Sequence, residues 1–231
     1  NSSVLGALCG DYVTLGKPEQ ALSRVEAAVK AHPQELAFLD LQVRSLMHAG
    51  RVEAAREVLA KAEAIDSNYA PVLELRGTLL RQAGQLDEAI SYFERAAKAS
   101  PRDAEYVYLA AQTLFMKQDA QAGTVRLRAA LDLDPGHVRA NNDLAWLLAS
   151  SGSELDRALE LAQTAVRLGR SADTLDTLGF VHLKRGDAED AVTILTKALE
   201  ARPDSPSIEY HLGAALAAKG DKEQARAMLT K

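Results

Sequence analysis

Five histidines and one cysteine are the residues of this chain best suited to bind a metal or to act in catalysis. The histidines are His32, His48, His137, His182 and His211. No two of them are four residues apart, the spacing that would place two imidazoles on one helical face as zinc ligands. The single cysteine, Cys9, can form neither an intramolecular disulfide nor a cluster of thiolate ligands. These residues therefore predict no metal site.

Other catalytic motifs are also absent from the sequence. The glycines stand singly rather than in a loop that could cradle a phosphate, and no serine lies in the glycine-flanked turn of a hydrolase nucleophile. We interpret Cys9 as a buried, unreactive thiol, because it occupies a small position within an apolar stretch. The sequence predicts no catalytic residue, no cofactor and no enzyme activity.

The composition excludes further classes of protein. The chain has 27 basic and 32 acidic residues and a net charge of −5, which argues against affinity for phosphate backbones. With 47% hydrophobic residues, it can bury a core rather than remain disordered. No apolar run approaches the ~18–20 residues needed to span a bilayer; among the longest is Val107 to Met116. We expect neither nucleic-acid binding nor membrane insertion within this chain.

One period of 34 residues runs through the sequence. Prolines lie at multiples of this period, at Pro33, Pro101, Pro135 and Pro203. Glycines repeat in the same way, at Gly16, Gly50, Gly84, Gly152, Gly186 and Gly220. A third series holds small residues, with a shift of one at Ala158: Ala21, Ala55, Ala89, Gly123, Ala158, Ala191 and Ala225. Several series at one period identify a repeat protein.

Each period is predicted to form two helices. Apolar residues at helical spacing, such as Leu73, Leu79 and Leu80, precede the glycine of the period. That glycine, here Gly84, can adopt the left-handed conformation that ends a helix. A second helix follows with an acidic first turn, such as Asp87, which is favourable beside the exposed amide groups of a helix start.

The second helix of each period resembles that of the tetratricopeptide repeat (TPR) family. The stretch Gly84 to Ala89, followed by Tyr92 to Ala96 and by Pro101, matches the signature of that helix. The family's small first-helix residue is matched by Gly77, Gly179 and Gly213. The resemblance covers the whole chain and implies an all-α fold, a right-handed superhelix of antiparallel helix pairs.

The resemblance divides residues 1–231 into one solenoid of seven repeats. Repeats are expected to begin near Ser2, Leu36, Ala70, Ala104, Val138, Ala172 and Pro206. Six are complete, and the seventh ends inside its second helix at Lys231. Because solenoids need a polar cap over the last apolar face, we expect the chain to be part of a longer protein, or its seventh repeat to pack on another copy.

Repeats four and five depart from the pattern. Gln118 stands where the turn glycine is expected, and Gly123 occupies the small position of the second helix. A glycine inside a helix costs roughly 0.5–1 kcal/mol relative to alanine, so repeat four is predicted to be weak. Repeat five carries one extra residue in its turn, between Ser150 and Glu154.

The resemblance also implies where a ligand binds, because the first helices of TPR repeats line a concave groove. In repeats two and three the groove positions hold Asp40, Arg44, Glu74 and Arg81. In repeats four to seven they hold Tyr108, Gln112, Phe115, Arg139, Asn142, Trp146, Phe180, Lys184 and Tyr210. Five of the eleven aromatic residues fall in this second set, and exposed aromatic side chains in a groove are suited to anchor a partner.

Some of these aromatic residues have an alternative role in the core. Phe115 and Phe180 can instead pack between neighbouring helices, whereas Trp146 is expected to be exposed because nearby leucines already fill the packing face of its helix. Asparagine and glutamine in the same set can donate to and accept from a peptide backbone. The lysine and asparagine clamp with which chaperone-type TPR domains hold a carboxylate is absent, because its positions include Gly6 and Gly10.

The most favoured function is a non-enzymatic scaffold that holds a peptide or a partner domain in the groove. Recognition of RNA, which some helical repeats perform, is disfavoured because acidic residues such as Asp40 and Glu74 share the groove with Arg44 and Arg81. The alternative function is a structural module that self-associates through the seventh repeat, within a bacterial envelope assembly or export system.

A second, narrower resemblance concerns the cellular setting. The segment Asn141 to Ala149, followed by Asp176 to Gly179, resembles bacterial TPR proteins associated with exosortase and exopolysaccharide export. This resemblance implies a periplasmic or envelope-associated location, with the cytoplasm as the alternative.

Overall fold

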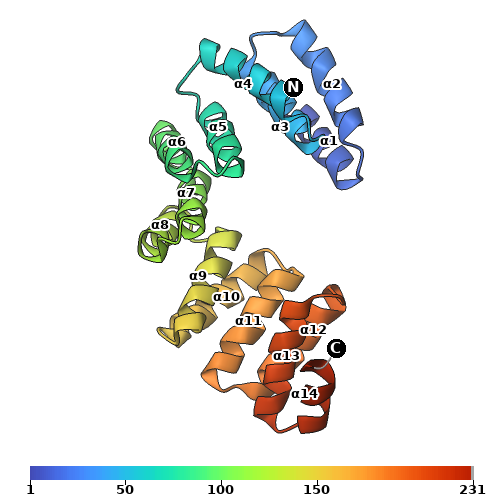
Figure 1. The fold of residues 1–231 in the computed structure, drawn as a ribbon, viewed down its shortest axis with the longest axis vertical. Coiled ribbons are helices and arrows are strands. Elements are labelled where there is room, and N and C mark those ends of the chain that lie inside the picture. The colour runs from blue at the N-terminus through green and yellow to red at the C-terminus, as the bar shows by residue number, and fades with distance from the viewer. Residues whose placement is uncertain (230–231) are drawn as a thin grey trace. The chain divides into compact units, whose positions relative to one another are not determined.

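The structure, a computed structural model, describes residues 1–229 as fourteen α-helices joined by short turns (Figure 1). The first helices of the repeats, here called A helices, are α1 (Ser2–Thr14), α3 (Leu36–His48), α5 (Ala70–Gln82), α7 (Ala104–Met116), α9 (Val138–Ser151), α11 (Ala172–Arg185) and α13 (Pro206–Lys219). The second, or B, helices are α2 (Pro18–Ala31), α4 (Val52–Ile65), α6 (Leu86–Ala99), α8 (Ala120–Leu133), α10 (Leu155–Leu168), α12 (Ala188–Ala201) and α14 (Lys222–Leu229).

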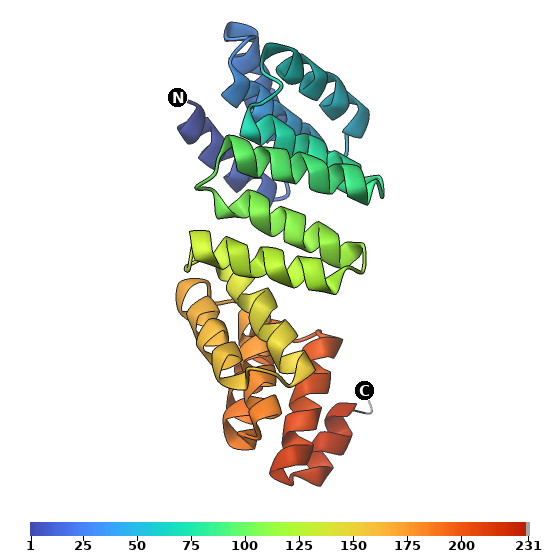
Figure 2. The same cartoon turned by 90° about the vertical axis from the view of Figure 1, so that its left-hand side faces the viewer.

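The A helices begin at the seven residues at which the 34-residue period places the repeats. Successive helices pack as antiparallel pairs, so the predicted all-α fold is confirmed (Figure 2). The predicted end of the seventh repeat at Lys231 lies outside the described residues. None of the helices within residues 1–229 is long and apolar enough to cross a membrane.

The chain divides into two compact units, residues 1–123 and residues 124–231, with the division inside α8. In the N-terminal unit α3 contacts both α1 and α5, and in the C-terminal unit α11 contacts both α9 and α13. The B helices contact mainly the A helices before and after them. The A helices therefore form the inner layer of each unit, and we call the exposed part of that layer the A surface.

The turn inside each repeat has one recurring backbone conformation. The six periodic glycines all have positive φ angles, between 69° and 101°. In repeat four Gln118 takes the same conformation with a φ of 65°, and in the longer turn of repeat five Glu154 has a φ of 49°. Because a side chain is unfavourable in this region of backbone space, these two turns are strained where the others are relaxed.

Small A-helix residues make room for large B-helix side chains. A Cβ atom on Gly77 of α5 would lie 2.8 Å from the ring of Phe93 in α6, which is fully buried. A Cβ atom on Gly179 of α11 would likewise lie 2.5 Å from Leu195 of α12. These glycines allow the two helices of a repeat to approach closely.

Repeat four reverses this arrangement. A Cβ atom on Gly123 of α8 would lie 2.8 Å from the ring of Phe115 in α7. Here the large side chain comes from the A helix and the glycine from the B helix. The prediction that Gly123 weakens its helix considered helix propensity alone and left this contact out. The glycine also makes the space that the Phe115 ring fills.

Candidate functional site

The fifth and ninth residues of each A helix lie on one face of the helix, because four residues make about one turn. In the C-terminal unit these positions hold Asn142 and Trp146 on α9, Asp176 and Phe180 on α11, and Tyr210 on α13. Since α11 contacts both α9 and α13, these residues belong to one continuous A surface, the C-terminal A surface.

The start of α9 is fixed by polar contacts. The side-chain amide of Asn141 is buried and donates to the backbone carbonyls of Pro135, at 2.9 Å, and His137, at 3.0 Å. The His137 ring accepts from the backbone N–H of Ala140 at 3.2 Å. These bonds satisfy groups at the helix terminus and fix the turn from which Asn142 and Trp146 project.

Asn142 and Trp146 present complementary chemistry on α9. Trp146 exposes 46% of its surface, as the sequence predicts. The Asn142 amide nitrogen lies 3.4 Å from the Asp143 carboxylate, whereas its carbonyl oxygen is buried and has no hydrogen-bond partner within residues 1–229. A buried acceptor without a donor is unfavourable, so a rotation of the Asn142 side chain that brings this oxygen to an N–H group of a ligand would stabilise the site.

Phe180 of α11 is held between a histidine and a lysine. Its ring centroid lies 4.8 Å from that of His211 on α13, and the Lys184 ammonium lies 5.3 Å from the Phe180 centroid. Half-buried Phe180 therefore supports the surface. The Tyr210 ring lies 5.8 Å from that of His211 between centroids and keeps 63% of its surface accessible.

The sequence does not predict the polar pair beneath this cluster. The Asp176 carboxylate lies 2.8 Å from the Nδ1 atom of His211, and both side chains are largely buried. Their separation of 35 residues, one period plus one, is the only signal that could have suggested the contact. The pair holds the His211 ring against Phe180 and thereby links α11 to α13.

The A surface of the N-terminal unit is ionic. The Arg44 guanidinium donates to Asp40 at 3.1 Å and to Glu74 of α5. Burial by itself lowers the pKa of Arg44, but the two carboxylates raise it above its usual range, so the side chain is fully charged. Thr78 also donates to Glu74, at 3.4 Å. Arg81 instead covers the ring of Phe93, at 5.5 Å.

One of the predicted groove aromatics, Tyr108, is corrected by the structure. Tyr108 is 1% exposed, and its hydroxyl accepts a hydrogen bond from the Gln112 amide at 2.6 Å. Phe115 packs on Gly123, which is the core role left open for it. The position of a residue in the repeat gives the direction of its side chain but not whether neighbouring side chains cover it, which is why the sequence placed Tyr108 in the groove.

The nine predicted groove residues therefore divide between the two units. Tyr108, Gln112 and Phe115 belong to α7 of the N-terminal unit, and two of them are engaged with each other. The other six lie on α9, α11 and α13: Arg139, Asn142, Trp146, Phe180, Lys184 and Tyr210. Because α11 contacts both α9 and α13, the six residues belong to neighbouring helices of one layer.

The site chemistry is that of recognition. Within residues 1–229 no group of three histidine, cysteine or acidic side chains could hold a metal ion. Cys9 is 5% exposed, and burial raises the pKa of its thiol, with a hydrogen bond involving Ser45 acting in the opposite direction. A thiol kept protonated in this way is a poor nucleophile.

Comparison with known proteins gives one consistent result. Sequence profiles described as tetratricopeptide repeat match residues 11–70, 75–123 and 126–173, and a further one matches residues 182–231. The chain is 30% identical over 181 residues to TPR repeat-containing protein PA4667 of Pseudomonas aeruginosa, an alignment that covers 76% of this chain and 30% of that protein.

Two further similarities extend the comparison. Cellulose synthase 2 operon protein C of Komagataeibacter xylinus is 26% identical over 183 residues, which is 79% of this chain and 12% of that protein. The chain thus spans less than a third of either relative. The structure of pilF from Pseudomonas aeruginosa superposes with a TM-score of 0.74 at 18% identity, over 90% of this chain and 95% of that one. A likeness at this identity shows a shared fold.

Proposed function

Because this chain belongs to the tetratricopeptide repeat family, whose members mediate protein–protein interactions, we propose that it is a non-enzymatic scaffold that holds a peptide or partner domain on its C-terminal A surface. The observation that carries this proposal is the pairing of an exposed indole, Trp146, with the unpartnered buried carbonyl of Asn142 one turn away. An aromatic side chain can bury a large apolar area against a ligand, and an amide carbonyl can accept a hydrogen bond that orients the ligand.

The other groove residues complete a recognition surface for an extended or helical segment. Tyr210 offers a second exposed ring, and Lys184 offers positive charge that can pair with acidic groups of a partner. The Asp176–His211 pair and Phe180 form a firm base, because their polar atoms are engaged within the unit. We expect Trp146 to contribute most, since large aromatic anchors dominate interface energies.

Two bacterial relatives support a bacterial setting for this role. The name of the Komagataeibacter xylinus relative ties that protein to a cellulose synthase operon. The resemblance to proteins of exopolysaccharide export points in the same direction. We therefore infer that the partner of this chain belongs to an envelope assembly or export system.

A titration against the captured partner tests the proposal. The parent chain is immobilised, partners are cross-linked and identified from the native lysate, and each purified partner is titrated against parent and variants. Trp146→Ala is expected to weaken binding by about 2 kcal/mol or more with helicity unchanged. Leu133→Ala is the matched control, because Leu133 of α8 is 45% exposed but lies on a B helix. Unchanged affinity of Trp146→Ala contradicts the proposal.

Self-association through the seventh repeat is the second candidate. Leu229 of α14 exposes half of its surface, at 50%, and apolar surface of this kind is buried when two copies pack together. Light scattering over a range of concentrations tests it. A dimer that is abolished by Ala227→Glu, a change at an exposed position of α14, would favour this function, and a monomer at every concentration would exclude it.

A further inference from the structure

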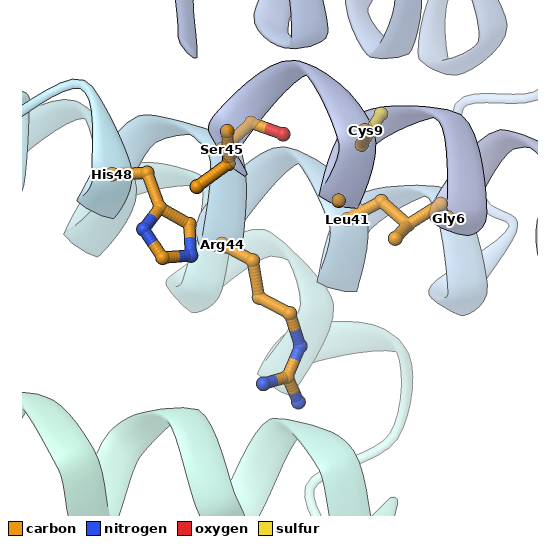
Figure 3. A pocket seen from close by; sticks show the side chains of 8 residues that line it. Gly6, Cys9, Leu41, Arg44, Ser45 and His48 are labelled. Carbon is orange, nitrogen blue, oxygen red and sulfur yellow. The ribbon is translucent and has the colours of Figure 1, made fainter. Parts of the chain in front are cut away.

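A pocket of about 160 Å³ lies between α1 and α3 in the N-terminal unit (Figure 3). Its lining includes Gly6 and Gly10, the fifth and ninth residues of α1, where the other A helices carry the side chains of the A surface. A Cβ atom on Gly10 would meet nothing within 4 Å. A Cβ atom on Gly6 would instead lie 3.3 Å from the Leu41 side chain. The open space therefore lies above Gly10, a helix position that faces the A surface and has no side chain.

The floor of the pocket is apolar and inert. Val13 and Leu41 contribute branched side chains, and the Cys9 sulfur lies 3.8 Å from the backbone carbonyl of Ala21. The pocket is lined mainly by carbon and is open to solvent on one side, so it suits one aliphatic side chain of a larger molecule. Burial of such a side chain is worth about 1.5–3 kcal/mol, which corresponds to a factor of ten or more in affinity.

The rim of the pocket carries polar side chains. The His48 ring is exposed and forms no hydrogen bond with any part of the chain that the structure describes. Figure 3 shows the Arg44 guanidinium turned away from Cys9, so that the stem of Arg44 lines the pocket while its charged group meets Asp40 and Glu74.

The charge beside the rim is negative. Two carboxylates surround one guanidinium, and the side chains of Asp40 and Glu74 are only 16% and 14% exposed, so water screens them poorly. The same carboxylates also affect the pKa values of two neighbouring tyrosines. Burial and then acidic groups that include Asp40 raise the pKa of Tyr69, and burial together with Asp103 and Glu74 raises the pKa of Tyr106 to about 12.

We propose that this pocket binds an aliphatic side chain of a basic peptide segment, one in which lysine or arginine flanks a leucine-like residue. The aliphatic group fills the space above Gly10, next to Leu41. The His48 ring contacts the peptide backbone, and the flanking cation lies beside Asp40 and Glu74. The site rests on the proposed function only in that the ligand is a peptide. It does not use the C-terminal A surface.

Fluorescence anisotropy with labelled peptides tests this site. The probes share a flexible glycine and serine background and carry a central leucine flanked by lysines, a central serine flanked by lysines, or a central leucine flanked by glutamates. We expect the first probe to bind at least about tenfold more tightly than the second. It should also bind more tightly than the third, with an affinity that falls as salt is added. Equal affinities, or no saturable binding of the first probe, overturn the proposal.

Two variants of α1 separate the pocket from the rest of the surface. Gly10→Leu fills the pocket and, by replacing a helical glycine, does not weaken the helix, so we expect about a tenfold loss of affinity for the first probe. Ala7→Leu adds the same side chain at an exposed position of α1 that does not line the pocket, and it should bind like the parent. Unchanged binding by Gly10→Leu overturns the proposal.

A third variant distinguishes this inference from the proposed function. Trp146→Ala is expected to bind the leucine–lysine probe like the parent, because Trp146 belongs to the other unit. If Trp146→Ala alone loses the probe, the peptide binds the C-terminal A surface and the pocket is not its site. If Gly10→Leu alone loses it, the pocket is supported whatever the result of the partner titration.

Discussion

The two units place different side chains at the same two positions of their A helices. In the N-terminal unit Arg44 is paired with Asp40 and Glu74, so the charged groups satisfy one another. In the C-terminal unit the equivalent positions carry an exposed indole, Trp146, and an amide carbonyl on Asn142 that lacks a partner. An identical backbone arrangement thus gives one surface whose ions pair with one another, with one carboxylate in excess, and one that carries an exposed aromatic ring.

The difference shows that the position of a residue in its repeat fixes the direction of its side chain. The neighbouring repeats decide whether that side chain already has a partner within the chain. Arg44 reaches across to the next A helix and finds a carboxylate 30 residues further on. Phe180 reaches across in the same way and finds His211. A residue of the A surface is free for recognition only where the adjacent helix offers it no partner.

The largest change in stability is expected when the ion pairs on the A surface of the N-terminal unit are broken. Arg44→Met keeps the aliphatic stem but leaves two largely buried carboxylates without their cation, so we expect a loss of about 1–2 kcal/mol in the free energy of unfolding. Lys184→Met removes only an exposed cation over the Phe180 ring and should cost about 0.5 kcal/mol. Urea unfolding followed by circular dichroism measures both. Equal costs would remove the distinction between the two surfaces.

The second prediction concerns Phe115 and the glycine on which its ring packs, Gly123. Gly123→Ala forces a methyl group into the Phe115 ring, a cost of about 1–3 kcal/mol that exceeds the gain of about 1 kcal/mol in helix propensity. We therefore expect a net loss of about 1 kcal/mol on urea unfolding. In a Phe115→Leu background the same change should cost less or stabilise. A Gly123→Ala protein more stable than the parent would show that Phe115 is not held by the glycine.

A smaller gain is expected at the strained turn of repeat four. Gln118→Gly removes a side chain from a residue with a φ of 65° and should stabilise the N-terminal unit by up to about 1 kcal/mol. Gln85→Gly is the matched control, because Gln85 precedes a B helix with a φ of −82° and has no such strain. Thermal unfolding of both variants measures the difference. Equal shifts in the two variants would show that the strain at Gln118 is not relieved by glycine.

The smallest expected change in stability appears only at alkaline pH and arises from a tyrosine of the N-terminal unit. Burial, with Asp103 and Glu74, raises the pKa of Tyr106 to about 12, whereas a tyrosine in the unfolded chain has a pKa of about 10. Folding therefore favours the protonated ring. Its contribution to stability is complete below pH ~10 and is lost as the pH rises towards about 12.

Tyr106→Phe tests this pH dependence. The variant should lose less stability than the parent between pH ~10 and ~12, and the two should differ little in their response below pH ~9. Urea midpoints measured across this range provide the comparison. A parallel fall in both proteins would mean that the Tyr106 hydroxyl does not carry the alkaline effect.

Much of the fold could be predicted because it depends on the spacing of residues that are close together in the sequence. The period of 34 residues placed the start of every A helix, and the glycine series placed the left-handed turn residues, such as Gly84 with a φ of 78°. Each of these features depends on residues within one helix or one turn. The same locality made Trp146 predictable as exposed, since Leu144 and Leu148 occupy the buried face of its own helix.

The sequence by itself determined the repeat, its helices and the face on which each side chain lies, because helical periodicity and turn chemistry act over a few residues. Only the tertiary structure decided which of those side chains are covered. Tyr108 is buried, Phe115 fills the space above Gly123, and Arg44 is neutralised by Glu74. These outcomes depend on packing between different helices, and the pocket above Gly10 depends likewise on the neighbouring α3. The period brings such helices together, but the shapes and charges of the particular side chains decide what they do there.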